Sequence, residues 1–333
     1  MEQFVRNLFS EDLFKRIIAC YQIDSNYKNL GDFENYAFEV YRNGTPMILR
    51  VTHSSHRSYK ELEAEIDWIQ YLQSCGISIP AVLLSPSGKV IEDFEAEDSF
   101  FFASLFEKAP GHPIQLDDNL FNEELFFIWG KTVGEMHFFT KAYRPGDNIH
   151  LRHQWNNNDL LRLDDYFPND EGEALTQAKM VVKEVEKLPK TKDSFGLIHS
   201  DLHQGNFFYE NGSIHIFDFD DASYHYFASD IAIPLYYAVN SKHFYGSREE
   251  RNEFANQFIQ AFLAGYREEN ELSFEWVKTI PLFLKLRDVE LFSVFNKKVT
   301  INERNERIQH WVHEIKNRII ANIAIVDLDL KDN

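Results

Sequence analysis

The most informative stretch of this sequence reads Leu197-Ile-His-Ser-Asp-Leu-His-Gln-Gly-Asn-Phe-Phe208. An apolar run leads into a polar segment that carries His199, Asp201 and Asn206. Their spacing, H-x-D-x-x-x-x-N, is typical of a loop that catalyses phosphoryl transfer. His, Asp and Asn are also common in ordinary loops, because they bond to local backbone groups. The spacing alone is therefore not decisive.

A second motif, Ile216-Phe-Asp-Phe-Asp-Asp221, strengthens this interpretation. Between the two motifs lies Asn211-Gly212, a turn signal that predicts a β-hairpin returning the chain to Asp218. In phosphoryl transfer an aspartate at this position is a magnesium ligand. The linked motifs predict an ATP- and Mg²⁺-dependent phosphotransferase. We expect Asp201 to orient and deprotonate the acceptor hydroxyl, and Asn206 and Asp218 to hold Mg²⁺.

The chain is strongly acidic. It has 34 Lys and Arg against 53 Asp and Glu, a net charge of −19. Such a surface repels nucleic acid and anionic membranes, so neither is expected as a partner. It attracts cationic small molecules, but spread-out acidic charge also simply keeps a protein soluble. Because the charge is spread along the chain, we favour solubility, with a weak tilt toward an amine-bearing acceptor.

The sequence predicts a cytoplasmic location. The two cysteines, Cys20 and Cys75, lie far apart in no metal-binding spacing, which favours free thiols in a reducing compartment. The first residues do not resemble a signal peptide. No apolar stretch approaches the ~18 residues that a membrane helix requires.

Hydrophobic periodicity predicts a strand-rich first hundred residues with one strong helix, followed by a helical remainder. Asn43-Gly44 predicts a turn between two strands, and Ser58 with Glu61 predicts a capping box that starts the helix. The expected strands are 33–42, 47–52, 81–84, 89–94 and 100–106. The expected helices are 58–74, 122–143, 171–188, 226–239, 249–269, 274–299 and 302–327. The fold class is therefore α+β, with a lobe boundary near 105–111.

These features together resemble the protein-kinase-like fold, and within it the aminoglycoside phosphotransferase / choline kinase-like family. The loop His199–Asn206 and the motif Ile216–Asp220 are closer to that family than to eukaryotic protein kinases, and no Ala-Pro-Glu follows them. The similarity spans about residues 25–300. It implies a nucleotide-binding lobe at 1–106 and a helical catalytic and acceptor-binding lobe at 107–333.

The resemblance assigns further roles, residue by residue. His199 corresponds to a histidine that braces the catalytic loop, and Asp230 to an aspartate that braces it from the next helix, although Asp230 also fits an ordinary helix N-cap. Glu65 corresponds to the acid that orients the ATP-binding lysine. At that lysine's position this chain has Arg50, whose fork suits bidentate contacts but changes the phosphate geometry.

The remaining nucleotide contacts are assigned by position. The phosphate-covering loop corresponds to Gly31–Tyr36, which lacks G-x-G-x-x-G, so backbone N–H groups and Asn35 must replace the missing glycines. The adenine hinge corresponds to Phe102–Glu107, with Leu105 as the cofactor-binding residue. Arg152 is a candidate for lining the acceptor site, and a packing role is an equal alternative.

Members of the resembling family phosphorylate hydroxyls of aminoglycosides, choline, ethanolamine or homoserine, and the residues of this chain do not choose among them. Two alternatives stay open. One is a bacterial Ser/Thr protein kinase of the same fold. The other is a nucleotide-binding pseudokinase, suggested by Arg50 and the glycine-poor loop. The sequence does not predict the oligomeric state.

Overall fold

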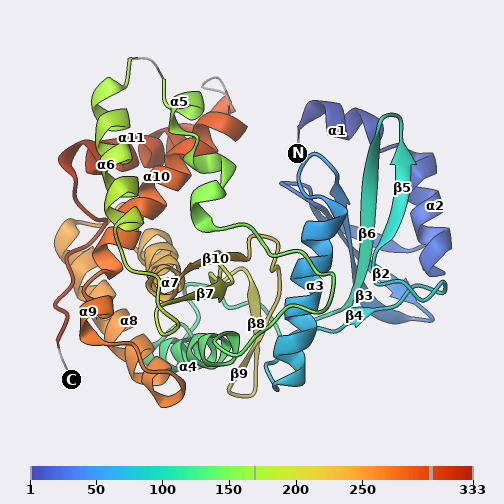
Figure 1. Ribbon diagram of the computed structural model, residues 1–333, viewed down its shortest axis with the longest axis horizontal. Helices are drawn as coiled ribbons and strands as arrows, with labels where there is room; N and C mark the ends of the chain where they lie inside the picture. Colours follow the sequence, from blue (N-terminus) through green and yellow to red (C-terminus); the bar gives the residue numbers. More distant parts are fainter. Residues whose placement is uncertain (1, 169, 300–302, 332–333) are drawn as a thin grey trace. The chain divides into compact units, whose positions relative to one another are not determined.

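The computed structural model describes residues 2–168, 170–299 and 303–331. The chain divides into two compact units. The first unit comprises Met1–Gly111, Tyr143–Arg152 and His215–Asp220, and the second comprises His112–Ala142, His153–Ile214 and Asp221–Asn333. Figure 1 shows a β-sheet with flanking helices in the first unit and mainly helices in the second.

The first unit is built on an antiparallel sheet in the order β1-β2-β3-β6-β4, with β5 also paired to β6. Its elements are α1 (Gln3–Leu8), α2 (Glu11–Tyr21), β1 (Tyr27–Gly31), β2 (Tyr36–Arg42), β3 (Thr45–His53), α3 (Tyr59–Ser74), β4 (Val82–Leu83), β5 (Glu92–Ala96) and β6 (Ser99–Glu107).

The side chains of the central strand β6 alternate between the two faces of the sheet, and they are buried on both faces. Along β6, Phe101, Ala103 and Leu105 join a core cluster that includes residues of α2. Phe102 lies on the opposite face and joins a cluster with α3. Figure 1 shows α2 and α3 flanking the sheet accordingly. The central strands β3 and β6 are therefore held rigidly, which positions the charged residues that they carry.

The expectation of a single helix among the first hundred residues is wrong, because α1 and α2 precede the sheet. Ser10 caps α2 by accepting a hydrogen bond from the Leu13 N–H. Leu13, Ile17 and Tyr21 lie on one face of α2 and are buried. Strand β1 was also missed, because all five of its residues are exposed and show no alternation.

The local turn and cap predictions in the first unit are confirmed. Asn43 and Gly44 join β2 to β3 with φ of 53° and 76°, the left-handed values that Asn-Gly accommodates in such a turn. Ser58 and Glu61 form the complete capping box at the start of α3. The predicted strand from residue 33 begins only at Tyr36, which leaves residues 32–35 as the loop between β1 and β2.

The second unit is mainly helical and carries short strands around the loop that contains Asp201. Its elements are α4 (Glu123–Thr140), the 3₁₀ helices η1 (Trp155–Asn157) and η2 (Asp159–Leu161), α5 (Leu163–Tyr166), α6 (Gly172–Glu186), β7 (Phe195–Ile198), β8 (Phe207–Glu210), β9 (Ser213–Ile216), β10 (Ser223–Tyr226), α7 (Phe227–Lys242), α8 (Arg248–Glu269), α9 (Phe274–Val277), α10 (Ile280–Lys298) and α11 (Glu306–Ala321). The last two residues of β9 belong to the first unit.

Two glycines let α4 and α8 pack unusually closely. A Cβ atom placed on Gly130 would lie 1.9 Å from the Phe262 carbonyl oxygen, and one on Gly265 would lie 1.9 Å from that of Phe127. No side chain fits at these distances, so glycine is required at both positions. This close pair forms the scaffold on which α7 and the neighbouring strands are placed.

Two helix predictions in the second unit are corrected. The expected helix 274–299 is divided into α9 and α10, and Pro281 stands in the first turn of α10, where its missing N–H costs no hydrogen bond. The expected helix 302–327 ends at Ala321, followed by Asn322 in the left-handed region. The start of that prediction, Asn302, lies outside the described residues. None of the helices in the described ranges is long and apolar enough to cross a membrane.

Candidate active site

The loop 199–206, here called the catalytic loop, connects β7 to β8 in the second unit. Strand β7 pairs with β10, and β8 pairs with β9 through the predicted hairpin, in which Asn211 and Gly212 have φ of 50° and 83°. Both ends of the loop are thus anchored in β-structure. Within it, the Asn206 N–H donates to the His203 carbonyl at 2.9 Å, which turns the chain back toward β8.

Asp230, on α7, holds the start of the catalytic loop. Its carboxylate accepts hydrogen bonds from the backbone N–H groups of His199 at 3.1 Å and Ser200 at 2.9 Å. Burial alone would raise the pKa of Asp230, but hydrogen bonds from His137 and the Ser200 N–H hold it below its usual value. Ser200 has a φ of 67°, an unusual conformation for a residue with a side chain. The prediction that Asp230 braces this loop is confirmed, and the N-cap alternative is wrong.

Replacing Asp230 with alanine is expected to destabilise the protein by about 3–5 kcal/mol, because three buried donors lose their acceptor. These donors are the N–H groups of His199 and Ser200 and the ring of His137. Denaturant unfolding measures the effect. The matched control, Asp164→Ala, removes a carboxylate that is 74% exposed, and it should change stability by less than about 0.5 kcal/mol. Equal stabilities of the two variants would contradict the bracing role.

Asp201 is surrounded by groups that fix its carboxylate. Arg287 Nη2 donates to Oδ1 in a short hydrogen bond, and Asn206 Nδ2 lies 3.4 Å from Oδ2. Asn206 Nδ2 also donates to the Asp201 carbonyl at 2.9 Å, while the Asp201 N–H lies 3.3 Å from His199 Nδ1. The structure therefore brings together His199, Asp201 and Asn206. The sequence predicts that these three side chains lie close together, because all three belong to one short loop.

Arg287 is the main residue that the sequence analysis missed. It comes from α10 and, besides Asp201, it donates to the Tyr237 hydroxyl at 2.7 Å and to Glu290 at 3.1 Å. Burial opposes its charge, but Tyr237, Asp201 and Glu290 outweigh burial and raise its pKa well above the ordinary value. Burial also raises the pKa of Glu290. The only signal was an Arg-x-x-Glu pair in this helix, which by itself indicates nothing specific.

His203 lies beside the same carboxylate. Its Nε2 is 3.5 Å from Asp201 Oδ2, and its Nδ1 accepts a hydrogen bond from the Gly205 N–H at 2.9 Å. Burial, reinforced by the nearby charge of Arg287, lowers the pKa of His203 to about 4. At neutral pH the imidazole is therefore uncharged, and Arg287 is the cation that faces Asp201.

In the first unit, Arg50 and Glu65 form a buried, bidentate ion pair. Arg50 on β3 donates through Nη1 and Nη2 to the two carboxylate oxygens of Glu65 on α3, each at 2.7 Å. Burial alone would lower the pKa of Arg50, but Glu65 more than offsets this and raises it above its ordinary value. The guanidinium also lies over the Phe106 ring, 5.2 Å from its centroid. Arginine at the expected lysine position is thus fully compatible with the paired glutamate.

The other residues predicted to contact the nucleotide, Asn35, Gly31 and Leu105, lie at different places in the first unit and do not contact one another directly in the hydrogen bonds below. Asn35 accepts a hydrogen bond from the Thr52 hydroxyl at 2.6 Å, which ties the 32–35 loop to β3. Gly31 ends β1, and its N–H donates to the Asn29 side chain. Leu105 lies opposite Leu49 in the sheet and is completely buried in the core. Its side chain therefore supports the sheet from within.

Two aspartates of the second motif, Asp218 and Asp220, lie in the first unit, and Asp221 begins the next segment of the second unit. Asp218 has a φ of 66°, in the left-handed region. Residues with such unusual backbone conformations are concentrated at functional sites. Asp220 is 4% exposed, and its Oδ2 lies 2.6 Å from His56 Nε2 and 3.4 Å from Arg57 Nη2. Burial raises the pKa of Asp220, but Arg57 and His56 hold it well below its usual value. Asp220 is therefore set among charged groups.

The donor groups of these motifs suit a divalent cation. Both hydrogen bonds recorded for the Asn206 side chain use Nδ2, so Oδ1 is the atom that remains for a metal. Asp218 supplies a carboxylate, and Asp220 Oδ1 is buried with no hydrogen-bond partner among the described residues. Amide and carboxylate oxygens are the ligands that Mg²⁺ and Ca²⁺ prefer. The side chains present therefore fit the predicted metal.

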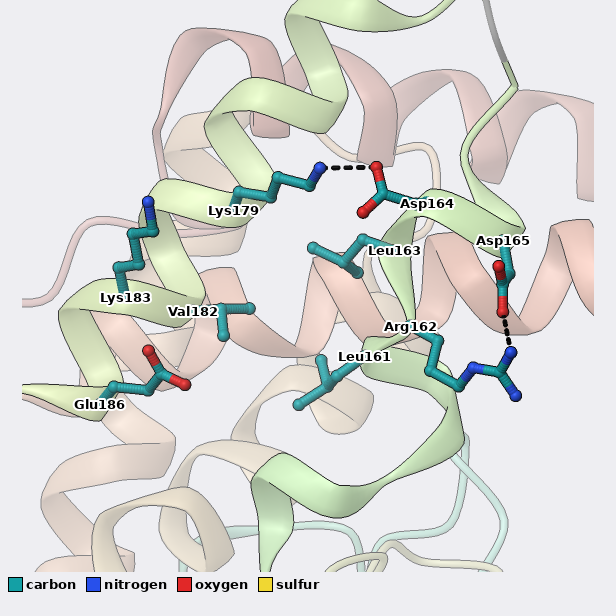
Figure 2. Close-up of a pocket in the computed structure, with 9 residues that line it drawn as sticks. All are labelled: Leu161, Arg162, Leu163, Asp164, Asp165, Lys179, Val182, Lys183 and Glu186. Carbon is teal, nitrogen blue, oxygen red and sulfur yellow. Dashed lines mark hydrogen bonds and ion pairs between the residues drawn. The ribbon is translucent and has the colours of Figure 1, made fainter.

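Arg152 favours the packing alternative. Its side chain is buried, and it donates to the backbone carbonyls of Glu61 and Asp220 within the first unit. A groove of about 440 Å³ in the second unit is also a weak candidate (Figure 2). It lies along α5 and α6, and four of its charged side chains form two ion pairs, Lys179 with Asp164 and Arg162 with Asp165. None of the predicted site residues lines this groove.

Comparison with known proteins places these features in a family. Residues 28–272 match the model of the phosphotransferase enzyme family. The chain is 35% identical over 297 residues to amicoumacin kinase of Bacillus subtilis (strain 168), covering 86% of each protein. A solved structure of amicoumacin kinase hAmiN in complex with AMP-PNP, Ca²⁺ and Ami matches with a TM-score of 0.93 and 32% identity, covering 99% of both chains. A microcompartment-associated aminopropanol kinase shares the fold, with a TM-score of 0.76 and 19% identity, covering 95% of this chain and 100% of the other.

The fold and the motifs define a kinase-like phosphotransferase of the α+β class, as the sequence predicts. The chain belongs to the phosphotransferase enzyme family. It is an enzyme that uses ATP and a divalent metal ion such as Mg²⁺ to phosphorylate a hydroxyl group of a small molecule. The predicted resemblance, enzyme class and cofactors are therefore confirmed.

Proposed function

We propose that the acceptor is a hydroxyl of an amine-bearing small molecule of the amicoumacin type. The proposal is supported by the two amicoumacin kinases, which are similar to this chain over nearly its whole length. The structural observation that carries it is the arrangement at Asp201, a carboxylate fixed by Arg287 and Asn206 in a braced loop. The net charge of −19 favours a cationic acceptor by long-range attraction.

We propose Asp201 as the base that orients the acceptor hydroxyl and takes its proton on a carboxylate oxygen as transfer proceeds. His199 supports this role by accepting the Asp201 N–H, and it does not exchange protons with the substrate. Arg287 holds the Asp201 carboxylate in its orientation. In this arrangement the residues of the catalytic loop contribute positioning and charge, which is the main demand of phosphoryl transfer.

We propose Asn206 and Asp218 as the ligands of the metal ion, which when bound neutralises charge on the phosphates. Arg50, kept in place by Glu65, contacts the nucleotide phosphates together with backbone groups of Gly31 and the side chain of Asn35. Leu105 supports the adenine site from inside the sheet. On this assignment residues 1–106 form the nucleotide-binding lobe, and residues 107–333 form the catalytic and acceptor-binding lobe. We also propose the cytoplasm as its location, since the reaction consumes ATP.

The acceptor class is tested by measuring kcat/KM with ATP and Mg²⁺ for a panel of amicoumacin, spectinomycin, an aminoglycoside, choline, aminopropanol and homoserine. Amicoumacin is expected to be the preferred acceptor by at least about a hundredfold, because a hydrogen-bonding site rejects molecules that leave its polar groups unpaired. A higher kcat/KM for any other compound would contradict the acceptor assignment and identify the better class.

The same assay separates the two alternatives. A generic protein substrate and the enzyme itself are included as acceptors, so that label in protein would favour a protein kinase. ATP binding without transfer to any acceptor would favour the pseudokinase. The positioned Asp201 carboxylate argues against the pseudokinase, because a protein that only binds nucleotide has no use for a positioned base.

A further inference from the structure

The turn between β3 and α3 carries two neighbouring side chains with nitrogen donors, His56 and Arg57, which have no role in the site described above. His56 Nε2 lies 2.6 Å from Asp220 Oδ2, and Arg57 Nη2 lies 3.4 Å from the same oxygen. Arg57 Nε also donates to the Asp220 carbonyl at 3.3 Å. Both side chains remain about one-sixth exposed. An imidazole and a guanidinium that retain access to solvent therefore converge on one carboxylate in the first unit.

The contacts of His56 and Arg57 with Asp220 are not needed to form the turn. The start of α3 is already secured by the capping box of Ser58 and Glu61. The neighbouring Arg152 differs from His56 and Arg57, because it is buried and is bonded to two backbone carbonyls, a purely structural role. His56 and Arg57 instead approach a side-chain carboxylate, an anionic group for which a phosphate oxygen can substitute.

The nucleotide half of the site also lacks the usual phosphate donors. The loop 31–36 has a single glycine, so backbone N–H groups cannot cradle phosphates in the usual way. Arg50 has both terminal nitrogens engaged with Glu65, which limits the donors that it can offer. Further donors in the first unit would therefore add to the contacts that Arg50, Asn35 and the metal ion make with a triphosphate.

The 31–36 loop approaches His56. Glu34, in the middle of the 31–36 loop, lies 3.9 Å from His56 Nε2. The loop expected to cover the phosphates and the turn that carries His56 and Arg57 are thus neighbours within one unit. Arg50 belongs to the same charged group, because the carboxylates of Asp220 and Asp218 both raise its pKa.

We propose that His56 and Arg57 bind the β- and γ-phosphates of the nucleoside triphosphate, and that Asp220 holds them in place until the nucleotide arrives. The proposal rests on the proposed function only in taking ATP as the phosphoryl donor. It explains how this chain recognises a triphosphate without the glycine-rich loop and without the lysine. Arg57, with its planar fork, makes the larger contribution.

Equilibrium binding of ATP, ADP and AMP, measured by calorimetry with Mg²⁺, tests the proposal on the full chain. For Arg57→Gln, ATP affinity is expected to fall roughly tenfold to a hundredfold, as for the loss of a charge-assisted hydrogen bond. ADP affinity should fall less, and AMP affinity should stay within about twofold. Arg57→Lys should recover part of the lost ATP affinity. In His56→Gln the losses should be smaller, and they should again be largest for ATP and smallest for AMP.

The control variant is Arg16→Gln, which removes the same charge from an exposed position on α2 in the same unit, and it should leave all three affinities unchanged. Retained AMP binding shows that each variant is folded. A ratio of ATP to AMP affinity equal to that of the wild type in both Arg57→Gln and His56→Gln would overturn the proposal. No acceptor is needed, so an error in the acceptor class cannot produce this result.

Discussion

Replacement of Asp201 by asparagine should lower kcat for phosphoryl transfer by a factor of about 10²–10⁴, while ATP affinity stays within about twofold of the wild type. The amide retains the size of the carboxylate but cannot accept the proton of the acceptor hydroxyl. The substitution also removes the negative charge that faces Arg287. Steady-state kinetics with the preferred acceptor, together with calorimetric ATP binding, measures the two quantities separately.

The control for this variant is Asp164→Asn, an exposed carboxylate in the same unit that pairs with Lys179. It should leave kcat unchanged. The assignment of Asp201 as the base fails if Asp201→Asn retains wild-type turnover. It also fails if ATP binding is lost along with turnover, because the residue would then be needed for nucleotide binding.

Replacement of Asp218 by asparagine should raise the Mg²⁺ concentration needed for half-maximal activity at least tenfold and lower kcat by about 10²–10³. A neutral amide oxygen is a weaker ligand for a hard cation than a carboxylate. The left-handed backbone at Asp218 tolerates asparagine well, so the fold should be retained. A Mg²⁺ titration of activity measures the first effect, and Mn²⁺ binding in the presence of a non-hydrolysable ATP analogue measures it independently of turnover.

Asp93→Asn serves as the control, since Asp93 is half exposed and pairs with Lys89 in the same unit. Its Mg²⁺ dependence should equal that of the wild type. An unchanged Mg²⁺ requirement in Asp218→Asn would show that the metal is held by other groups, and Asp220 would be the next residue to replace.

The sequence was most predictive where a feature depends on residues close together in the chain. Both Asn-Gly pairs form the expected turns, because both residues tolerate positive φ. The capping box at Ser58 is likewise local. The chain order His199, Asp201, Asn206 is sufficient to predict that these side chains share one loop. The bracing role of Asp230 came from the family resemblance and not from any local pattern.

The features that were missed depend on contacts between distant segments or on weak local patterns. Arg287 lies 86 residues from Asp201 in sequence, and nothing near it predicts that it faces a catalytic carboxylate. The positive φ at Ser200 and Asp218 has no signature in the residue types. Helix α2 could have been predicted from the spacing of Leu13 and Ile17 behind the cap at Ser10.

The most direct test of the central claim is to follow the γ-phosphate of labelled ATP with the wild-type protein, Mg²⁺ and amicoumacin. The label is expected on one hydroxyl of the small molecule, with a product mass higher by one phosphate group, and it should be absent when Asp201 is replaced by asparagine. Label found only as inorganic phosphate or on protein, or product formed equally well by the Asp201 variant, would contradict the account.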